Sequence, residues 1–427
     1  MVSDEDNELM CLVEGDAPMG RVMRQFWIPA LLSTELAERD GDPVHVKLLG
    51  QDFVAFRDSN GKVGLLDEHC CHRGASLTIG RVENCGIRCI YHGWLFDADG
   101  TVLETPNVND PKFKERFKAR AYPVREAGGF IWAYLGDTAH MPPLPDFPWM
   151  EAGADMRLNT LSIVKCNFVQ LIEALHDSSH LGVLHVSALQ SYSDSPTLYA
   201  KNTAHMLTAR QPRIEAEDTE FGMHYAAMRD VDGRQETRVA AFISPFWSLH
   251  PHGDLTIGMI PMSNTETAFF NVWWDGTSRF GEDPLRSSQL EIIGITDAQQ
   301  RDFGLDRQTY TEARAPSRAN GFHQDRDLMR KGHFSGIRSL MMEDIAVAQS
   351  AGPIRSRSNE HLSTSDAAIG KIYRILIKSA RSVANGGAPV FSGKSVRHIV
   401  GRQDTIDPGT PWQTIVPENR QPAPENA

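Results

Sequence analysis

The first third of the chain passes from helical to strand periodicity. Apolar residues on a polar background predict a helix over residues 5–13, and a second helical stretch, 19–26, follows the break at Gly15. From residue 44 onward the apolar positions form short runs typical of β-strands, at 44–49, 53–56, 63–66, 101–103 and 130–135. Asn60-Gly61 and Asp99-Gly100 are typical hairpin turns. The pattern predicts an N-terminal helical segment over 1–42 and a small all-β domain over 43–140.

A proline-rich stretch, 141–148, separates this domain from a larger region of mixed periodicity. We place a linker at 141–155 and a second domain at 156–416. Strand-like runs at 161–165, 238–243, 255–261 and 268–274 are enough for one antiparallel sheet, and helical patterns cover 168–176, 336–349 and 365–384. Residues 417–427 are polar and proline-rich, which predicts a disordered tail. The expected fold class is α+β.

Charge and cysteine content narrow the possible partners. The 427 residues include 43 Lys and Arg against 55 Asp and Glu, a net charge of −12, so neither nucleic acid nor an anionic membrane is an expected partner. The start of the chain is acidic and no apolar stretch approaches about 18 residues, so we expect a cytoplasmic protein. Four of the six cysteines lie between residues 70 and 89, which in a reducing compartment indicates a metal site rather than disulfides.

Two short loops in that region each offer a cysteine and a histidine at close spacing. Residues 69–74 read H-C-C-H-R-G and residues 89–94 read C-I-Y-H-G-W. Taken as C-x-H and C-x-x-H, they give the ligand set Cys70, His72, Cys89 and His92. Two thiolates and two imidazoles suit a structural zinc or a Rieske-type [2Fe-2S] cluster. Zinc loops usually donate one kind of ligand each, whereas here each loop donates both, which favours the cluster and leaves zinc as the alternative.

Nearby residues refine this interpretation. Gly74 and Gly93 follow the histidines closely and would let backbone N–H groups approach the cluster sulfides. Cys71 is a rival ligand to Cys70, and the choice of Cys70 depends on the C-x-H spacing alone.

A second group of possible ligands follows the predicted helix at 168–176. Asp177 and His180 are three residues apart, which would place them on one helical face, and His185 follows after Gly182. Two imidazoles and one carboxylate form the facial triad of non-haem Fe(II) oxygenases, which leaves coordination positions open. His176 is a rival ligand, and the alternative is that these are helix-end or solvated residues.

The third ligand of such a triad would come from far downstream. Residues 341–347, M-M-E-D-I-A-V, place Glu343 and Asp344 on an otherwise apolar helix. A buried carboxylate has to be paired or coordinated, because an uncompensated charge in apolar surroundings is costly.

Together these motifs resemble the Rieske non-haem iron ring-hydroxylating oxygenases. The usual cluster loop of that family is C-P-H-R-G, with Cys71 here at the proline position, and its iron motif is D-x2-H-x4-H. Further segments, including 17–20, 25–29, 48–50 and 358–366, are similar to the phthalate 4,5-dioxygenase-like branch, which also includes O-demethylases such as dehydrodivanillate O-demethylase. In that branch the aspartate is the third ligand, which implies Asp344, with Glu343 as the fallback.

The resemblance implies cofactors, partners and a reaction. The cofactors are a Rieske [2Fe-2S] cluster and a mononuclear Fe(II). Asp177 is implied to connect His180 to His92 of a neighbouring subunit in a homotrimer or a dimer of trimers. Electrons are implied to come from an NADH-dependent reductase with flavin and a plant-type [2Fe-2S] centre. With O2, the protein would dihydroxylate an aromatic acid of the phthalate type or demethylate a methoxylated, lignin-derived one.

The substrate is the least specified part of the interpretation. An anionic ring needs a cation in the pocket, and Arg238 is the candidate, against the alternative of a surface salt bridge. Phe242, Phe246 and Trp247 line the pocket or fill the core, with core as the default. The alternative function is a Rieske monooxygenase acting on a non-carboxylated aromatic or other small apolar substrate. A pure electron-transfer protein and a zinc-stabilised binding protein are the competing classes.

Overall fold

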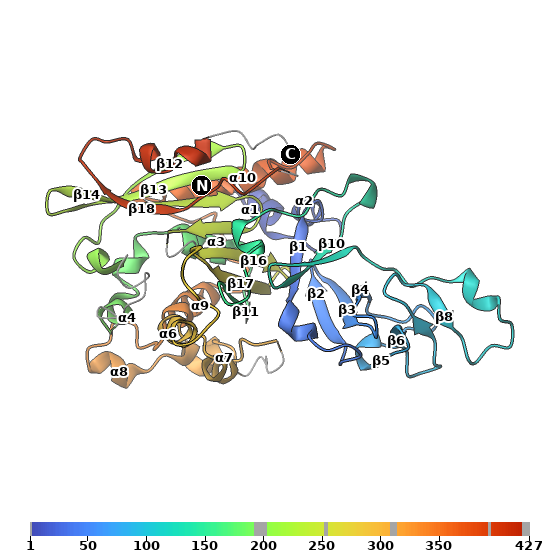
Figure 1. The fold of residues 1–427 in the computed structure, drawn as a ribbon. Coiled ribbons are helices and arrows are strands. Elements are labelled where there is room, and N and C mark those ends of the chain that lie inside the picture. The colour runs from blue at the N-terminus through green and yellow to red at the C-terminus, as the bar shows by residue number, and fades with distance from the viewer. Residues whose placement is uncertain (1, 192–202, 252–254, 308–313, 392–393, 421–427) are drawn as a thin grey trace. The chain divides into compact units, whose positions relative to one another are not determined.

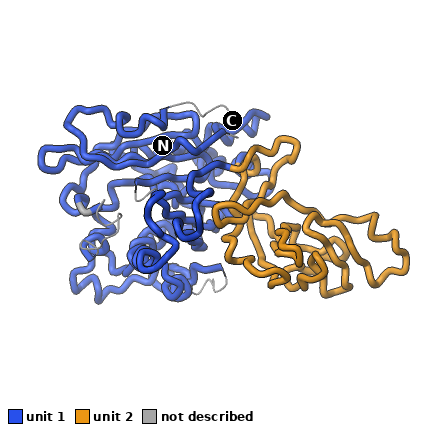
Figure 2. The backbone as a smooth tube through the Cα atoms, in the orientation of Figure 1, with its two compact units in different colours: residues 1–22, 145–427 blue, residues 23–144 orange. Residues whose placement is uncertain are grey.

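A computed structural model describes residues 2–191, 203–251, 255–307, 314–391 and 394–420 (Figure 1). The chain forms two compact units, one of residues 23–144 and one of residues 1–22 and 145–427 (Figure 2). The boundary after Leu144 falls inside the predicted linker. Residues 1–22 belong to the large unit and the rest of the predicted N-terminal segment to the small one, so the structure divides this part of the chain differently from the sequence pattern.

The small unit is built from short antiparallel strands, as the period-two runs predicted. Its described residues form three sheets, ordered β1-β10-β9, β2-β3-β4 and β5-β6-β7-β8. The strands are β1 (Trp27–Leu32), β2 (Val44–Leu48), β3 (Gln51–Arg57), β4 (Val63–Asp67), β5 (Arg81–Glu83), β6 (Gly86–Arg88), β7 (Leu95–Phe96), β8 (Val102–Glu104), β9 (Val124–Ala127) and β10 (Phe130–Tyr134). Both predicted hairpins are confirmed, since β3 pairs with β4 and β7 with β8.

The predicted helical stretch 19–26 extends too far, because the chain leaves the helix before residue 26 and then forms strand β1. Helix α2 (Pro18–Met23) ends early, and the chain then enters β1, which pairs with β10. Pro29 lacks the N–H that a central strand needs, but β1 is an edge strand with a register shift between Pro29 and Leu31. The apolar run 27–32 is therefore a strand despite its proline.

The large unit is organised around one antiparallel sheet. Within the described residues its eight strands are ordered β11-β17-β16-β15-β14-β13-β12, with β18 paired to β14. They are β11 (Leu158–Val164), β12 (Arg213–Thr219), β13 (Gly222–Val231), β14 (Arg234–Ile243), β15 (Trp247–His250), β16 (Leu255–Pro261), β17 (Thr267–Trp273) and β18 (Arg402–Ile406). The predicted single sheet is confirmed, with more strands than the sequence pattern indicated.

Helices pack on this sheet and frame the site. Those described in the large unit are α1 (Asp4–Cys11), α3 (Phe168–His176), α4 (Val186–Ser191), α6 (Leu285–Ile293), α7 (Asp297–Phe303), α8 (Arg326–Arg330), α9 (Leu340–Ser350) and α10 (Ala367–Ala384), together with most of α2. Helix α3 packs on β16 and α9, and α10 packs on β12 and β13. Asn167 begins α3 because its side chain accepts the N–H of Val169.

A buried ionic network joins the start of the chain to α3. The fully buried Arg357 is ion-paired with Glu173 of α3, and its Nη1 donates to Asn7 Oδ1 of α1 at 2.7 Å. Tyr373 of α10 donates its hydroxyl to Glu173 at 2.7 Å, and Arg355 lies 3.1 Å from the same carboxylate. Removing one partner of such a buried pair costs about 3–5 kcal/mol because the other charge stays buried. The network therefore fixes α3 against α1 and α10.

The last described residues differ from the predicted disordered tail. Residues 417–420 form a 3₁₀ turn in which Asn419 is buried. Its side chain accepts the N–H of Val400 at 2.8 Å and donates to the Val400 carbonyl at 2.8 Å. The disorder prediction is wrong for 417–420, and residues 421–427 lie outside the described part. Among the helices described, none has the length and apolar character needed to cross a membrane.

Candidate metal centres

The two cysteine-histidine loops of the small unit share one backbone geometry. Cys70 N donates to the carbonyl five residues later at 2.8 Å, and Gly74 N donates back to the Cys70 carbonyl at 2.9 Å. In the second loop, Cys89 N and Gly93 N make the same two bonds, each at 2.9 Å. Both glycines have the left-handed backbone such a loop requires, with φ of 72° and 76°. Cys70 and Cys89 therefore occupy equivalent positions in the two loops, and the neighbouring Cys71 does not occupy such a position.

The side chains agree with this equivalence. Cys70 and Cys89 are buried in the small unit's core, whereas Cys71 is exposed. Burial and the nearby Cys89 thiol raise the pKa of Cys70 to about 12, although a backbone hydrogen bond at His72 opposes this. The rings of His72 and His92 lie 4.6 Å apart between centroids. Two close thiols and two close imidazoles fit a [2Fe-2S] cluster with mixed ligands.

The His92 side chain gives a further indication that these loops bind a metal centre. Its Nδ1 is buried and, among the described residues, has no hydrogen-bond partner. A buried polar atom without a partner is unfavourable unless it binds something, and a metal ligand is one explanation. Trp94 stacks on the His72 ring at 4.5 Å with an interplanar angle of 2°, which orients that imidazole.

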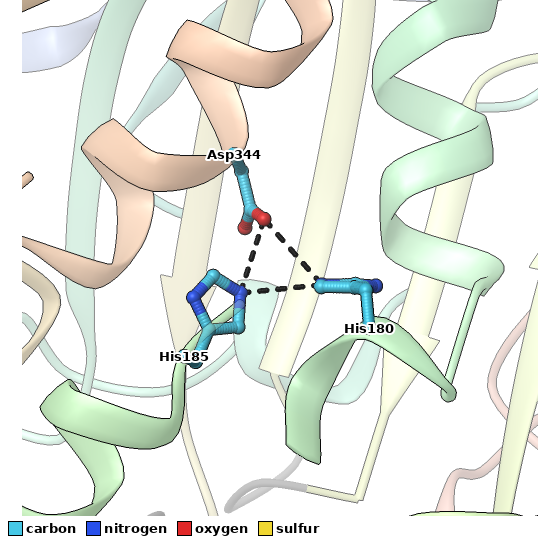
Figure 3. A group of neighbouring side chains, drawn as sticks. All are labelled: His180, His185 and Asp344. Carbon is cyan, nitrogen blue, oxygen red and sulfur yellow. Dashed lines mark hydrogen bonds and ion pairs between the residues drawn. The ribbon is translucent and has the colours of Figure 1, made fainter. Parts of the chain in front are cut away.

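The second constellation converges in the large unit. Helix α3 ends at His176, so Asp177 is its C-cap rather than part of a longer helix as expected, and His180 begins a 3₁₀ turn. His180 Nε2 and His185 Nε2 lie 3.2 Å apart, and Asp344 Oδ1 of α9 lies 3.4 Å and 3.0 Å from them (Figure 3). These three atoms lie within 4.8 Å of one another and could hold a divalent ion as a facial triad.

The far side of each imidazole meets another carboxylate. His180 Nδ1 lies 3.4 Å from Asp177 Oδ2, and His185 Nδ1 lies 2.7 Å from Glu343 Oε2. The structure thus brings Asp344 to the shared face and turns Glu343, the fallback ligand, to the back of His185.

The charges in this site are strongly coupled. Burial alone would lower the pKa of His180, but the carboxylates of Asp177 and Asp344 raise it to about 10. Burial likewise opposes, and Asp344 supports, a raised pKa of His185. Burial would raise the pKa of Asp344, yet the two imidazoles hold it well below its usual range. A divalent cation would replace these protons, as metal binding generally does.

Two other sequence candidates have structural roles. His176, the rival ligand, points away: its Nδ1 donates to the Ile172 carbonyl at 2.8 Å and its Nε2 accepts from Ser248 Oγ at 3.0 Å. The aromatic residues 242, 246 and 247 are buried in the core.

A cavity adjoins the triad between the sheet and helices α3 and α9. Alternate residues of β16 and β17 face it, because side chains alternate along a strand. Its lining is mostly apolar, and the side chains with polar groups outside 177–180 and Asp344 are Tyr225, Arg238, His250 and Asn271. Arg238 is buried on β14, so the surface salt-bridge interpretation is wrong. Sequence reasoning missed His250 and Asn271: Asn271 lies in the predicted strand run 268–274, whereas His250 lies in β15, which the sequence pattern did not predict.

Comparison with known proteins decides the family. Residues 26–123 match the Rieske [2Fe-2S] domain, and residues 133–422 match the family described as LigXa C-terminal domain like. The phthalate 4,5-dioxygenase oxygenase subunit of Pseudomonas putida is 35% identical over 405 residues, covering 92% of this chain and 90% of that one. The chain belongs to the Rieske non-haem iron oxygenases.

Other comparisons agree with this Rieske oxygenase assignment. The 3-chlorobenzoate-3,4-dioxygenase oxygenase subunit of Comamonas testosteroni is 35% identical over 407 residues, covering 91% of each chain. The structure of dicamba monooxygenase bound to dicamba shares the fold, with a TM-score of 0.57 at 19% identity over 85% of this chain and 98% of that one. The predicted family and fold class are confirmed.

Membership of the Rieske oxygenase family establishes the class of reaction and the cofactors. The chain is an oxidoreductase whose cofactors are a Rieske [2Fe-2S] cluster and a mononuclear iron. Its relatives are named oxygenase subunits, which indicates that this chain is the oxygenase component of a multicomponent system. The zinc-binding and pure electron-transfer interpretations are therefore set aside.

The shared loop geometry predicts which thiols hold the cluster. Cys70→Ser and Cys89→Ser should abolish the visible absorption, because each removes one of the two equivalent buried thiolates. Cys71→Ser and Cys85→Ser are the matched controls and should keep it. A colourless Cys71→Ser protein would assign that ligand to Cys71 instead.

The converging atoms of the triad predict the effect of removing each ligand. His180→Ala, His185→Ala and Asp344→Ala should each lose the mononuclear iron and turnover while keeping the cluster absorption. Iron and sulfide analysis of the purified variants measures this. Full iron content and activity in Asp344→Ala would show that another carboxylate is the ligand.

Proposed function

We propose that this Rieske oxygenase hydroxylates a small aromatic acid, using O2 and electrons from an NADH-dependent reductase. The observation that carries the proposal is the cavity beside the triad, whose wall includes His180, Asp344 and the buried Arg238. The relatives named for phthalate and 3-chlorobenzoate support an aromatic carboxylate. The reaction is a ring dihydroxylation or an O-demethylation.

The cavity suits an aromatic anion for two reasons. Apolar side chains, the majority of them from β16, β17, α3 and α9, form most of its wall, so a ring would displace water there. Arg238 would place a guanidinium in these apolar surroundings, where a carboxylate gains most from a charged hydrogen-bond donor. Arg238 would thus bind the carboxylate and the apolar wall would orient the ring.

We further propose a role for each metal-site residue. Cys70, Cys89, His72 and His92 hold the cluster, and His180, His185 and Asp344 hold the iron. When bound, the two centres supply electrons and activate O2, and the protein supplies position and path. Asp177 keeps the His180 imidazole oriented through its Nδ1, and Ser179 fixes Asp177 by donating its N–H at 2.7 Å.

A neighbouring subunit would complete the electron path. A surface groove of the large unit is lined by Asp177, His180 and the exposed apolar residues Val347 and Leu362. On the small unit, the apolar residues 90 and 91, directly before His92, are also exposed. Apolar surfaces beside both ends of the path suit a head-to-tail contact between copies, which a trimer or a dimer of trimers closes. The reductase is of the flavin and plant-type [2Fe-2S] kind, and the system works in the cytoplasm.

The substrate proposal predicts the behaviour of Arg238→Met. With a reductase and a panel of aromatic acids, the KM for the best acid should rise about 10- to 100-fold, because one charged hydrogen-bonding partner worth about 1.5–3 kcal/mol is lost. Arg234→Met, on the exposed part of the same strand, is the control and should behave like wild type. If only neutral aromatics are turned over, and Arg238→Met leaves their KM unchanged, the non-carboxylated alternative is correct.

We also propose that Asp177 connects His180 to His92 of a neighbouring subunit, which predicts that Asp177→Asn keeps both metals but slows electron transfer between them. The amide preserves shape while removing the charge beside His180. In a single turnover of pre-reduced protein with substrate and O2, the cluster absorbance should recover far more slowly than in wild type. Reoxidation at the wild-type rate with product formed would leave Asp177 as an ordinary helix-end residue.

A further inference from the structure

Glu343 is a buried acid that the proposed reaction leaves without a task. It precedes Asp344 on α9, and successive helix positions point about 100° apart. Asp344 therefore faces the shared site and the cavity, while Glu343 points into the protein beside His185. Glu343 has no exposed surface, so neither solvent nor another subunit reaches it.

The hydrogen bonds around Glu343 have a fixed direction. Ile337 N donates to Ser335 Oγ at 3.0 Å, and Ser335 Oγ donates its hydrogen to Glu343 Oε1. The other oxygen, Oε2, lies 2.7 Å from His185 Nδ1. A carboxylate only accepts, so Nδ1 has to carry the hydrogen and donate it. The lone pair of the neutral ring then lies on Nε2, the atom that faces Asp344 and His180.

Glu343 and Asp177 resemble each other but differ in access. Each places a carboxylate on the Nδ1 of one triad histidine, at 2.7 Å for His185 and 3.4 Å for His180. The Asp177 side chain is 27% exposed and lines the surface groove, whereas Glu343 is closed off on all sides. Asp177 can therefore be reached from the surface groove, whereas Glu343 can act only on the triad.

We propose that Glu343, held by Ser335, is a positioning residue that fixes the tautomer and orientation of His185 and strengthens its bond to the iron. Carboxylates that accept from a metal-bound histidine make the ring a better electron donor, and losing them typically weakens metal binding about 10- to 100-fold. The proposal rests on the iron site proposed above. It assigns to Glu343 a role distinct from that of a direct ligand.

The test compares Glu343→Gln with a matched variant elsewhere in the sheet. Glu217 Oε2 lies 3.1 Å from Nε2 of the buried His224, so Glu217→Gln removes the same kind of contact without touching a triad residue. Ser335→Ala is a milder second variant, because it leaves Glu343 in place and removes only the bond that holds it. All are measured on the full-length protein after circular dichroism and thermal unfolding have shown that the large unit is folded.

Two readouts separate positioning from general damage. Fe(II) affinity, measured by competition with a chelator, should fall about 10- to 100-fold in Glu343→Gln, fall less in Ser335→Ala, and stay unchanged in Glu217→Gln. The electron paramagnetic resonance spectrum of the ferrous site with bound nitric oxide reports the ligand field at the iron. The shape of this spectrum should change in Glu343→Gln and Ser335→Ala and should not change in Glu217→Gln.

Each outcome has one interpretation. Wild-type affinity and spectrum in both Glu343→Gln and Ser335→Ala would overturn the positioning role while leaving the iron site intact. Complete loss of iron in Glu343→Gln with retention in Asp344→Ala would make Glu343 a ligand and overturn the proposal. A wild-type protein that binds no iron at the triad would instead contradict the proposed function.

Discussion

The pairing of the partly buried Asp344 carboxylate with two imidazoles is the constraint on which the iron site of the large unit depends. An anion in this interior is tolerated only with compensating charge, and the two rings provide it when protonated. Helix α9 brings the carboxylate, and the turn after α3 brings the rings. The packing of α3 on α9 and on β16 therefore decides whether three atoms meet within reach of one cation.

The same helix pair separates two kinds of electrostatic support. On the α3 side, Asp177 lines a surface groove. Its carboxylate accepts a hydrogen bond from the Ser179 N–H and is paired with the His180 ring. On the α9 side, Glu343 and Ser335 form a closed chain of hydrogen bonds that ends at a backbone N–H. A redox site needs both a closed support and an open one, because its ligands have to keep their positions while electrons have to reach it from outside.

The sequence predicted local features well and distant assembly poorly. Spacing identified His180 and His185, and the helix at 168–176 agrees with α3, because ligands and helical periodicity are encoded within a few residues. The hairpin between β13 and β14 was missed although its turn, Asp232-Gly233, is a strong signal and both residues have the left-handed backbone. The cavity could not be predicted, because it joins α3, α9 and alternate residues of several strands that only the tertiary fold brings together. Likewise, the sequence left Cys70 and Cys71 equal but for spacing, whereas the loop hydrogen bonds distinguish them.

The contact between Asn7 and Arg357 has a consequence for the order in which the protein matures on the ribosome. The segment carrying α1 is made first, yet its partners Glu173, Arg357 and Tyr373 emerge much later. Residues 23–144, by contrast, can fold as soon as they are synthesised, because domains generally fold as units during synthesis. The small unit can therefore fold while α1 still lacks its partners, and the ionic network is complete only after Tyr373 of α10 has been synthesised.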